Sequence, residues 1–221
     1  MKEEIIKTLL EKSQVKQKVY DNTKEAFKTI KSILQDIVSE YNADLINADK
    51  RVLLEYRDRG VFEAEIRIAG DLLIFNMHSN IFEFPLEHQI WKAVSAKEDP
   101  LSTYGGIINI YNFLSDSFKY NRAEDIGYLI GRIFINKNNH YFIEGQKELG
   151  STYPSFDENK ITQDELKKVV DGTILYALKF DLLVPPLKNI QLATVNQMKE
   201  RINKSKIQTG KRVGFNYNTE D

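Results

Sequence analysis

The sequence has no cysteine among its 221 residues. A disulfide framework, a thiolate nucleophile and a thiolate metal site are therefore excluded, and the composition is compatible with a reducing compartment. No apolar run approaches the roughly 18 residues of a membrane-spanning helix, and the start, Met1-Lys2-Glu3-Glu4, lacks the apolar core of a signal peptide. We therefore expect a cytoplasmic protein without a membrane partner.

Net charge and recognisable site motifs are scarce as well. The formal net charge is -1, which argues against a polyanion-binding protein that works through bulk charge. The three histidines, His78, His88 and His140, do not form a zinc motif, and no phosphate loop, dinucleotide-binding turn or nucleophile elbow occurs. The sequence accordingly predicts no catalytic residue, no metal ligand and no cofactor, and it favours a protein that is not an enzyme.

What the sequence does contain is a long stretch of strand-like alternation, residues 51–85. Four segments separated by turn-forming residues alternate between apolar and polar side chains, which predicts an antiparallel meander. The turn chemistry predicts a register that keeps the apolar residues on one face. The predicted cross-strand pairs are Tyr56 with Phe62, Ile68 with Leu73, and Met77 with Phe82.

The opposite face of the predicted meander gathers acidic side chains. Its polar members include Glu55, Glu63, Glu65, Asn76, His78 and Glu83. The predicted register places His78 beside Glu63 and Asn76 between Glu65 and Glu83. Neighbouring carboxylates attract protons, cations or a basic peptide, so we take these residues as a candidate ligand or partner surface. The alternative is a solvated face, because glutamates on a flat sheet usually diverge into water.

Helical periodicity surrounds the meander. Residues 1–20 are expected to form an amphipathic extension, and a separate helix over 23–42, which begins near Asp21, Asn22 or Thr23, carries a broad apolar stripe. Packing of this stripe on the meander is favoured. A coiled-coil dimer is the alternative and leaves a homo-oligomer open.

The second half of the chain is predicted to add both helices and strands. Strands are expected at 86–92 and 190–195, a helix at 103–119, a short helix and then a hairpin within 122–145, a loop at 146–160, and a helix with a capping box at 162–180. The prediction is an α+β protein of one domain, residues 1–221. Its antiparallel meander sheet has five to seven strands and is packed on one face by amphipathic helices.

A basic tail ends the chain at residues 199–221. Within 199–212 six lysine and arginine residues oppose one glutamate, a local charge of +5. Nucleic-acid or partner contacts would use Arg201, Lys204, Lys206, Lys211 and Arg212. The alternatives are a solvated, frayed terminus and a tail that docks on the acidic face of the meander.

Four sequence runs resemble those of a family of uncharacterised bacterial cytoplasmic proteins. They are Glu55-Tyr56-Arg57-Asp58-Arg59-Gly60, Asn109-Ile110-Tyr111-Asn112-Phe113-Leu114, Phe180-Asp181-Leu182-Leu183-Val184-Pro185-Pro186 and Gln208-Thr209-Gly210-Lys211-Arg212. The resemblance implies a bacterial, cytosolic protein and carries over no activity and no site.

The function expected from the sequence is a non-catalytic binding or scaffold protein with a protein or small-molecule partner. Nucleic-acid binding through the tail is the second hypothesis. A metal-dependent enzyme that uses Glu63, Glu65, His78 and Glu83 is the third.

Overall fold

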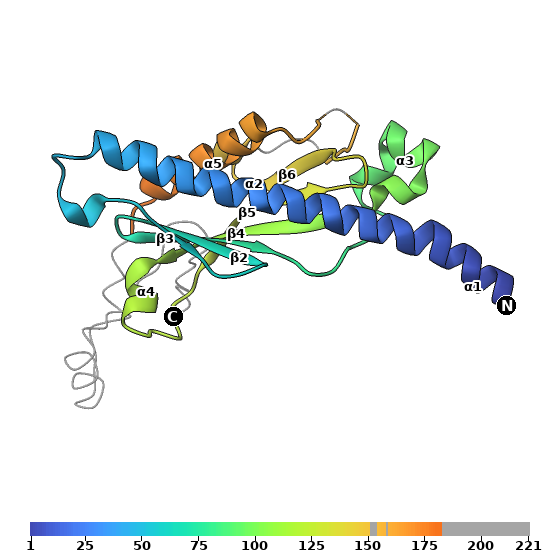
Figure 1. The fold of residues 1–221 in the computed structure, drawn as a ribbon, viewed down its shortest axis with the longest axis horizontal. Helices are drawn as coiled ribbons and strands as arrows, with labels where there is room; N and C mark the ends of the chain where they lie inside the picture. Colours follow the sequence, from blue (N-terminus) through green and yellow to red (C-terminus); the bar gives the residue numbers. More distant parts are fainter. Residues whose placement is uncertain (151–153, 158, 183–221) are drawn as a thin grey trace, which may run out of the picture.

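A computed structural model describes residues 1–150, 154–157 and 159–182, and Figure 1 shows how their elements are arranged. The main elements are α1 (Lys2–Thr8), the π-helical turn η1 (Leu9–Ser13), α2 (Gln14–Asp44), β1 (Glu55–Asp58), β2 (Glu63–Ile68), β3 (Asp71–Met77), α3 (Val94–Glu98), β4 (Gly106–Leu114), α4 (Ser115–Lys119), β5 (Tyr128–Ile135), β6 (Tyr141–Gly145) and α5 (Gln163–Leu178). Short 3-10 turns are η2 (Lys50–Val52), η3 (Gln89–Lys92), η4 (Pro100–Thr103) and η5 (Lys147–Leu149). The predicted α+β class is confirmed.

Helices α1, η1 and α2 follow one another without a break and form one long rod (Figure 1). The predicted start of a separate helix near Asp21, Asn22 or Thr23 is wrong. Asn22 is buried, and its side-chain amide donates to the carbonyl oxygens of Asn136 (3.0 Å) and Lys137 (2.9 Å). Polar residues of this type cap helices, but the same side chains also bond to backbone groups from within a helix.

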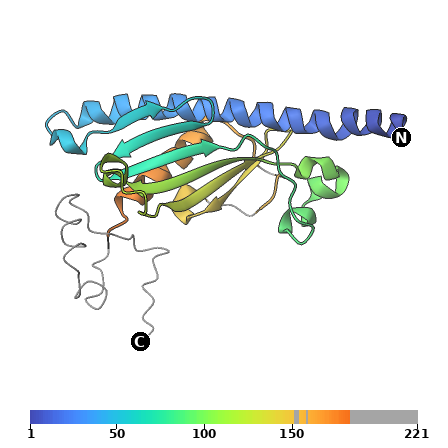
Figure 2. The ribbon, with the colours of Figure 1, turned by 90° about the horizontal axis from the view of Figure 1, so that it is seen from below.

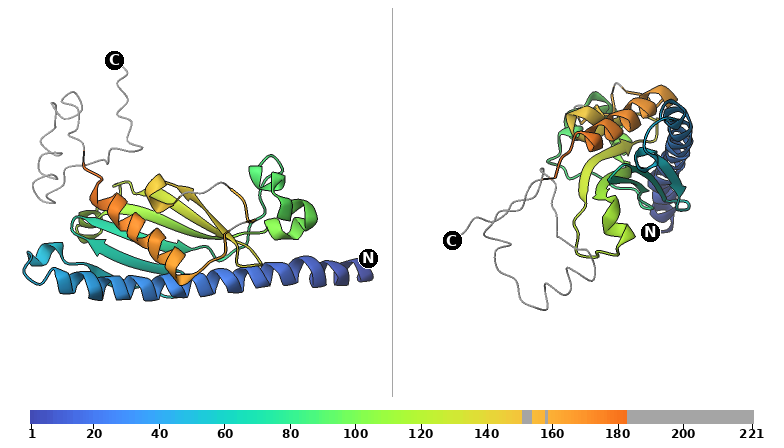
Figure 3. Two further views of the ribbon diagram at one scale, coloured as in Figure 1. Left: turned by 90° about the horizontal axis from the view of Figure 1, so that it is seen from above. Right: turned by 90° about the vertical axis from the view of Figure 1, so that its left-hand side faces the viewer.

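The six strands form one antiparallel sheet in the order β1-β2-β3-β4-β5-β6, which confirms the predicted meander of five to seven strands. Helices α2 and α5 pack on one face, as predicted for 23–42 and 162–180, and the views from below and above show the sheet from its two sides (Figures 2 and 3). We call this the core face; its buried strand residues include Ala64, Ile66, Leu73, Phe75, Ile108, Ile110, Ile133 and Ile143. The other side is the reverse face, which carries Glu63, Glu65, Arg67, Leu72, Ile74 and Asn76.

The first hairpin has a longer loop than predicted. Tyr56 pairs with Ile66 rather than with Phe62, because residues 59–62 connect β1 to β2. The register is therefore shifted by four residues. Side chains alternate between faces with a period of two, so this even shift leaves each residue on the face that was predicted for it.

The second hairpin is shifted by two residues because its two-residue turn lies one position earlier in the chain than predicted. Ile68 pairs with Asp71 rather than with Leu73, and the turn lies at Ala69 and Gly70. Ala69 adopts a left-handed conformation with φ of 50°, which is uncommon for a residue with a Cβ atom. The predicted division into an apolar and a polar face again survives, because the shift is even.

The predicted fourth strand, with Met77 opposite Phe82, is wrong. Met77 lies opposite Ile108 of β4 instead. Strand β4 takes up most of the segment 103–119 that the periodicity predicted as a helix, and only the last five residues of that segment are α-helical, as α4. Ile108 is buried on the core face and Ile107 on the reverse face. A strand that is apolar on both sides lacks the alternation of a half-exposed strand, and periodicity alone cannot distinguish it from a buried helix.

Residues 86–92, predicted as a strand, lead through η3 into α3. They help to cover one end of the reverse face, where Ile90 packs with Phe134, Phe142 and Phe156 in a second apolar cluster. Phe134 and Phe142 belong to β5 and β6, so the cluster covers the reverse face at that end of the sheet, and the remaining reverse face lies toward β1 and α4.

The hairpin predicted within 122–145 is confirmed, whereas the short helix before it is strand β5. Ile135 pairs with Tyr141 across the turn. Gly131 belongs to β5, where an added Cβ would come within 2.4 Å of Cδ2 of Leu149. The small residue therefore serves close packing of η5 on the sheet rather than packing between helices.

Helix α5 begins as the capping box predicted. The Thr162 hydroxyl accepts a hydrogen bond from the backbone N–H of Glu165 at 3.2 Å. The Tyr41 hydroxyl of α2 donates to Asp171 of α5 at 2.6 Å and joins the two helices that cover the core face. No helix within the described ranges has the length and apolarity needed to cross a membrane. The predicted strand at 190–195 lies outside the described residues.

Candidate functional site

The structure separates the residues that were predicted to form one acidic surface. Glu63 lies opposite Asn76, so its predicted pairing with His78 is wrong. The His78 ring accepts a hydrogen bond from the backbone N–H of Asn80 at 3.0 Å and meets the Phe82 ring edge-on, with centroids 4.7 Å apart. His78 thus belongs to the turn that follows β3.

Glu83 lies outside the six strands and forms an ion pair with Lys12 of η1 at 3.7 Å. Asn76 is flanked in the sheet by Glu63 and Asn109, so its predicted position beside Glu83 is wrong. Throughout the described ranges, no three His, Cys, Asp or Glu residues come together in a way that could hold a metal ion. The geometry therefore offers no support for the metal-site hypothesis.

Glu55 and Glu65 remain together on the reverse face, and each is paired with an arginine. Glu55 accepts hydrogen bonds from both Nε (3.1 Å) and Nη2 of Arg67. Oε2 of Glu65 lies 3.0 Å from Nη2 of Arg59, and the Glu65 side chain is only 6% exposed. The surface that was predicted to be acidic is thus a mixed surface of arginine and glutamate.

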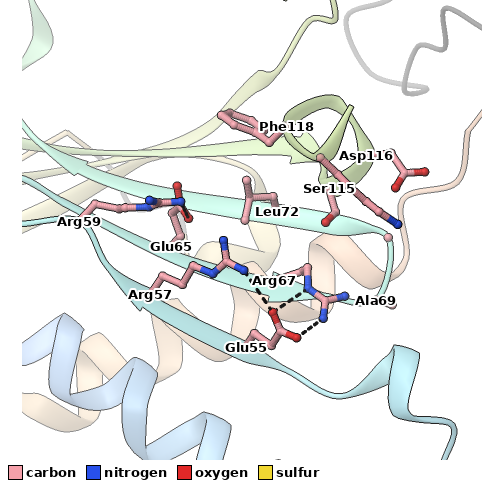
Figure 4. Close-up of a pocket in the computed structure, with 12 residues that line it drawn as sticks. Glu55, Arg57, Arg59, Glu65, Arg67, Ala69, Leu72, Ser115, Asp116 and Phe118 are labelled. Carbon is pink, nitrogen blue, oxygen red and sulfur yellow. Dashed lines mark hydrogen bonds and ion pairs between the residues drawn. The ribbon is translucent and has the colours of Figure 1, made fainter. Parts of the chain in front are cut away.

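A groove of about 690 Å³ opens over these ion pairs (Figure 4). Strands β1 and β2 form its floor, and the start of α4 lines the opposite side. Its charged lining residues are Glu55, Arg57, Arg59, Glu65, Arg67, Asp116 and Lys119. The four cations exceed the three carboxylates by one positive charge. We call this the arginine groove.

The strand period explains why the arginines gather here. Glu55 and Arg57 lie two residues apart on β1 and share the reverse face with Glu65 and Arg67 of β2. Arg57 lies opposite Glu65, so each strand presents an acidic and a basic residue to the other. Arg59 follows in the loop after β1 and reaches back over the same face to Glu65.

Helix α4 is held against the groove by the backbone. The N–H of Ser115 donates to the carbonyl oxygen of Gly70, at 2.8 Å, and so ties the first residue of α4 to the turn between β2 and β3. Phe118 of α4 packs edge-on against Phe113 of β4, with ring centroids 5.3 Å apart, and still exposes much of its surface. The groove therefore combines cationic walls with an apolar rim.

The ion pairs keep the groove charged over a wide pH range. The hydrogen bond from Arg67 lowers the pKa of Glu55, and the same bond raises the pKa of Arg67. The hydrogen bond to Glu65 likewise raises the pKa of Arg59. These carboxylates act as fixed counter-charges that position the guanidinium groups.

The arrangement is chemically suited to an anion. A guanidinium group has five N–H donors in a planar fork, which can bind a carboxylate or a phosphate through two parallel hydrogen bonds. Arg57 faces the groove at 62% side-chain exposure, and its ion pair with Glu55 is loose, at 3.7 Å. It can therefore turn toward a ligand at little cost.

Most of this site differs from the site that the sequence predicts. Arg57, Arg59 and Arg67 are not among the predicted site residues, and residues 115–119 belong to the predicted helix 103–119. The spacing of two between Glu55 and Arg57, repeated by Glu65 and Arg67, was the available signal, because it places basic and acidic residues on one face.

The tail cations predicted as a nucleic-acid or partner surface lie outside the described residues: Arg201, Lys204, Lys206, Lys211 and Arg212. Their role stays a prediction. Comparison of the chain with protein-family models, with curated proteins and with solved structures found no match.

Proposed function

We propose that this is a non-catalytic binding protein whose arginine groove holds the carboxylate or phosphate group of a small molecule. The observation that carries the proposal is the convergence of Arg57, Arg59 and Arg67 on one groove, with Glu55 and Glu65 as their counter-charges. The volume of about 690 Å³ falls in the range of roughly 300–1,000 Å³ that small-molecule sites occupy.

The carboxylates of the groove favour binding over catalysis. A general acid or base works best when its pKa lies near the working pH. The pKa of Glu55 is lowered by Arg67, which keeps this group ionised and makes it a poor proton carrier at neutral pH. Glu65 is covered by Arg59 and lies beneath the groove rather than at its opening.

The ligand of this proposal has two parts. An anionic group would meet the guanidinium forks of β1 and β2, and an apolar part would rest on Leu72 and Phe118. We place the protein in the bacterial cytosol, on the grounds of its lack of cysteine and of the family resemblance of its sequence runs.

Calorimetry and thermal melting with inorganic phosphate, succinate and citrate at constant ionic strength test the proposal. We expect at least one of these anions to bind and to raise the melting temperature, because a ligand that binds only the folded state stabilises it. Arg57→Gln should weaken that binding about tenfold or more. The matched control is Arg51→Gln, whose side chain is exposed and paired with Asp49 away from the groove.

Two results would contradict the proposal. One is the absence of any heat of binding and any melting shift with all three anions up to millimolar concentration. The other is binding that Arg57→Gln and Arg51→Gln weaken equally, since that would reflect general charge and not the groove.

A further inference from the structure

Three aromatic rings lie next to the arginine groove on the reverse face of the sheet. Tyr111 and Phe113 are two residues apart on β4, so both side chains stand on the same face. Their partners on β3 are Ile74 and Leu72, which belong to the reverse face. The ring centroids of Tyr111 and Phe113 are 6.3 Å apart, and those of Phe113 and Phe118 are 5.3 Å apart. We call these three residues the aromatic row; it begins at the groove, because Phe118 also lines the groove.

Phe118 is the member of the aromatic row that a ligand can reach from the groove. It is 52% exposed, and Figure 4 shows its ring above the strands, with Leu72 between it and Arg57. A Cβ atom added at Gly127 would lie 2.1 Å from Cε1 of Phe113, so the loop after α4 packs tightly on that ring. Phe118 meets the fixed Phe113 ring edge-on. Its position is therefore supported, while much of its surface stays exposed.

The cationic side and the aromatic side of the groove are separated by a fixed width of sheet. Arg67 lies opposite Leu72 of β3, and Leu72 in turn lies opposite Phe113 of β4. Neighbouring strands are about 4.8 Å apart, so about 10 Å of sheet separates the arginine from the aromatic residue. A ligand that contacts both sides must therefore carry an anionic group and a flat ring, joined by a spacer.

We propose that the arginine groove binds a nucleotide, with the phosphate on Arg57 and Arg67 and the base on Phe118. This inference rests on the proposed function and specifies the chemical class of the ligand. A nucleotide fits because its ribose separates the phosphate from a flat ring. Every base has a π face that can stack on an aromatic side chain, and phosphate oxygens accept paired hydrogen bonds from a guanidinium group.

The arginines keep donors for the phosphate although they are paired with a glutamate. The hydrogen bonds from Arg67 to Glu55 use Nε and Nη2, so the Nη1 group of Arg67 is left for a ligand. Arg57 is held only loosely by Glu55, at 3.7 Å. Ser115 also lines the groove, and Figure 4 shows its hydroxyl directed toward the groove, where it can bond to the ribose. The groove thus offers polar contacts to the phosphate and to the sugar.

The charge of the groove favours a single nucleotide over a strand of RNA or DNA. Its four cations exceed its three carboxylates by one positive charge, which suits one phosphate group. A protein that binds a polynucleotide neutralises several phosphates with lysine and arginine side chains. The carboxylates of the groove would repel the further phosphates of a strand. The ligand that we infer is therefore a mononucleotide.

Calorimetry at constant ionic strength tests the base and the spacer separately. Adenosine 5′-monophosphate should bind at least about tenfold more tightly than ribose 5-phosphate, because stacking of the base adds to the contacts of the phosphate. Phenyl phosphate has a ring but no spacer, so its ring cannot reach Phe118 while its phosphate lies on the arginines. It should bind at least about tenfold more weakly than the nucleotide.

Substitution of Phe118 tests the aromatic contact. In Phe118→Ala the preference for the nucleotide over ribose 5-phosphate should fall below about threefold, whereas Phe118→Tyr should retain it. The matched control is Phe82→Ala, which removes a ring that is 37% exposed and lies beside His78, away from the groove. This control should bind both compounds as the wild type does. Circular dichroism melts confirm that each variant is folded.

The inference is overturned if the nucleotide and ribose 5-phosphate bind equally, if phenyl phosphate binds as tightly as the nucleotide, or if Phe118→Ala and Phe82→Ala change the preference equally. Tighter binding of a thymidine oligonucleotide, with an affinity that falls steeply with salt, would overturn it as well. In each of these cases, binding of ribose 5-phosphate that Arg57→Gln weakens would still support the proposed function. If no phosphate compound binds, the inference fails, and binding of succinate or citrate decides whether the proposed function stands.

Discussion

The carboxylate of Glu65 lies 3.0 Å from the guanidinium of Arg59, and it is almost completely buried beneath a side chain that is 47% exposed. The backbone N–H of Arg59 donates to the carbonyl oxygen of Glu63 at 3.1 Å. The loop after β1 is therefore fastened to β2 by both its backbone and its side chain. This double contact fixes one wall of the arginine groove.

Replacement of the buried carboxylate should loosen this wall. Glu65→Gln removes the counter-charge of Arg59 but keeps the shape of the side chain, and we expect a loss of about 1–2 kcal/mol in the free energy of unfolding. The partly exposed Arg59 can turn into water, which limits the loss. Urea unfolding measures it, and Glu87→Gln on the exposed surface is the control. An unchanged midpoint in Glu65→Gln would show that the pair is not stabilising.

The hydrogen bonds of Asn22 should stabilise the contact between α2 and the turn of the last hairpin. Its amide donates to the carbonyl oxygens of Asn136 and Lys137, so Asn22→Ala leaves two acceptors without this donor and should cost about 1–3 kcal/mol. Asn22→Asp should be at least as harmful, because a carboxylate cannot donate. The exposed Asn47→Ala serves as the control in the same thermal melts. Equal stability of Asn22→Ala and the control would show that the two hydrogen bonds of Asn22 do not stabilise the protein.

Replacement of Gly172 by alanine should destabilise the protein, whereas the same replacement at most helical glycines stabilises it. Replacement of an exposed helical glycine by alanine usually stabilises by up to about 1 kcal/mol. A Cβ at Gly172 would lie 2.0 Å from the carbonyl oxygen of Glu148, a backbone atom that cannot easily move. Gly172→Ala should therefore destabilise by about 2 kcal/mol or more. Gly70, around which an added Cβ meets no atom within 4 Å, provides the comparison with Gly70→Ala. A stabilised Gly172→Ala protein would refute the close approach.

Alkaline pH should destabilise the protein through Tyr141. Burial, aided by the charge of Glu165 and by a hydrogen bond to it, raises the pKa of Tyr141 from 10.0 to about 12. The unfolded chain then releases this proton at lower pH than the folded protein does. The stabilisation is complete below pH 10 and is lost as the pH rises from about 10 to about 12, with a loss of about 2–3 kcal/mol.

Urea unfolding at pH values from 8 to 12 tests this linkage. Tyr141→Phe should be less stable than the wild type at pH 8, because the hydrogen bond is lost, but should lose less of its stability between pH 10 and 12. The exposed Tyr120→Phe should follow the wild-type curve. Parallel curves for Tyr141→Phe and the wild type would contradict the assignment.

Local patterns in the sequence were sufficient to predict part of the fold. The alternation in 51–85 assigned residues correctly to the two faces of β1 to β3, because errors of two and four residues in register preserve the face. The cap at Thr162 was also predictable, since it depends on residues only three positions apart.

The parts of the fold and of the site that the sequence did not predict depend on tertiary contacts. Ile107 and Ile108 are buried on opposite sides of β4 by elements far away in sequence, so their spacing resembled that of a helix. The arginine groove could not be predicted as a site for a related reason. Its opposite wall is α4, whose position depends on the bond between Ser115 and Gly70 across the sheet.

The placement of α2 also has a consequence for the order in which the protein is completed during synthesis. The buried stripe of α2, with Phe27, Ile30 and Leu34, is synthesised before any strand of the sheet. The last helix that shares its core, α5, follows more than a hundred residues later. A nascent chain must therefore hold this stripe without its final partners for most of its translation, which makes the early helix the segment most in need of protection from aggregation or of binding by a chaperone.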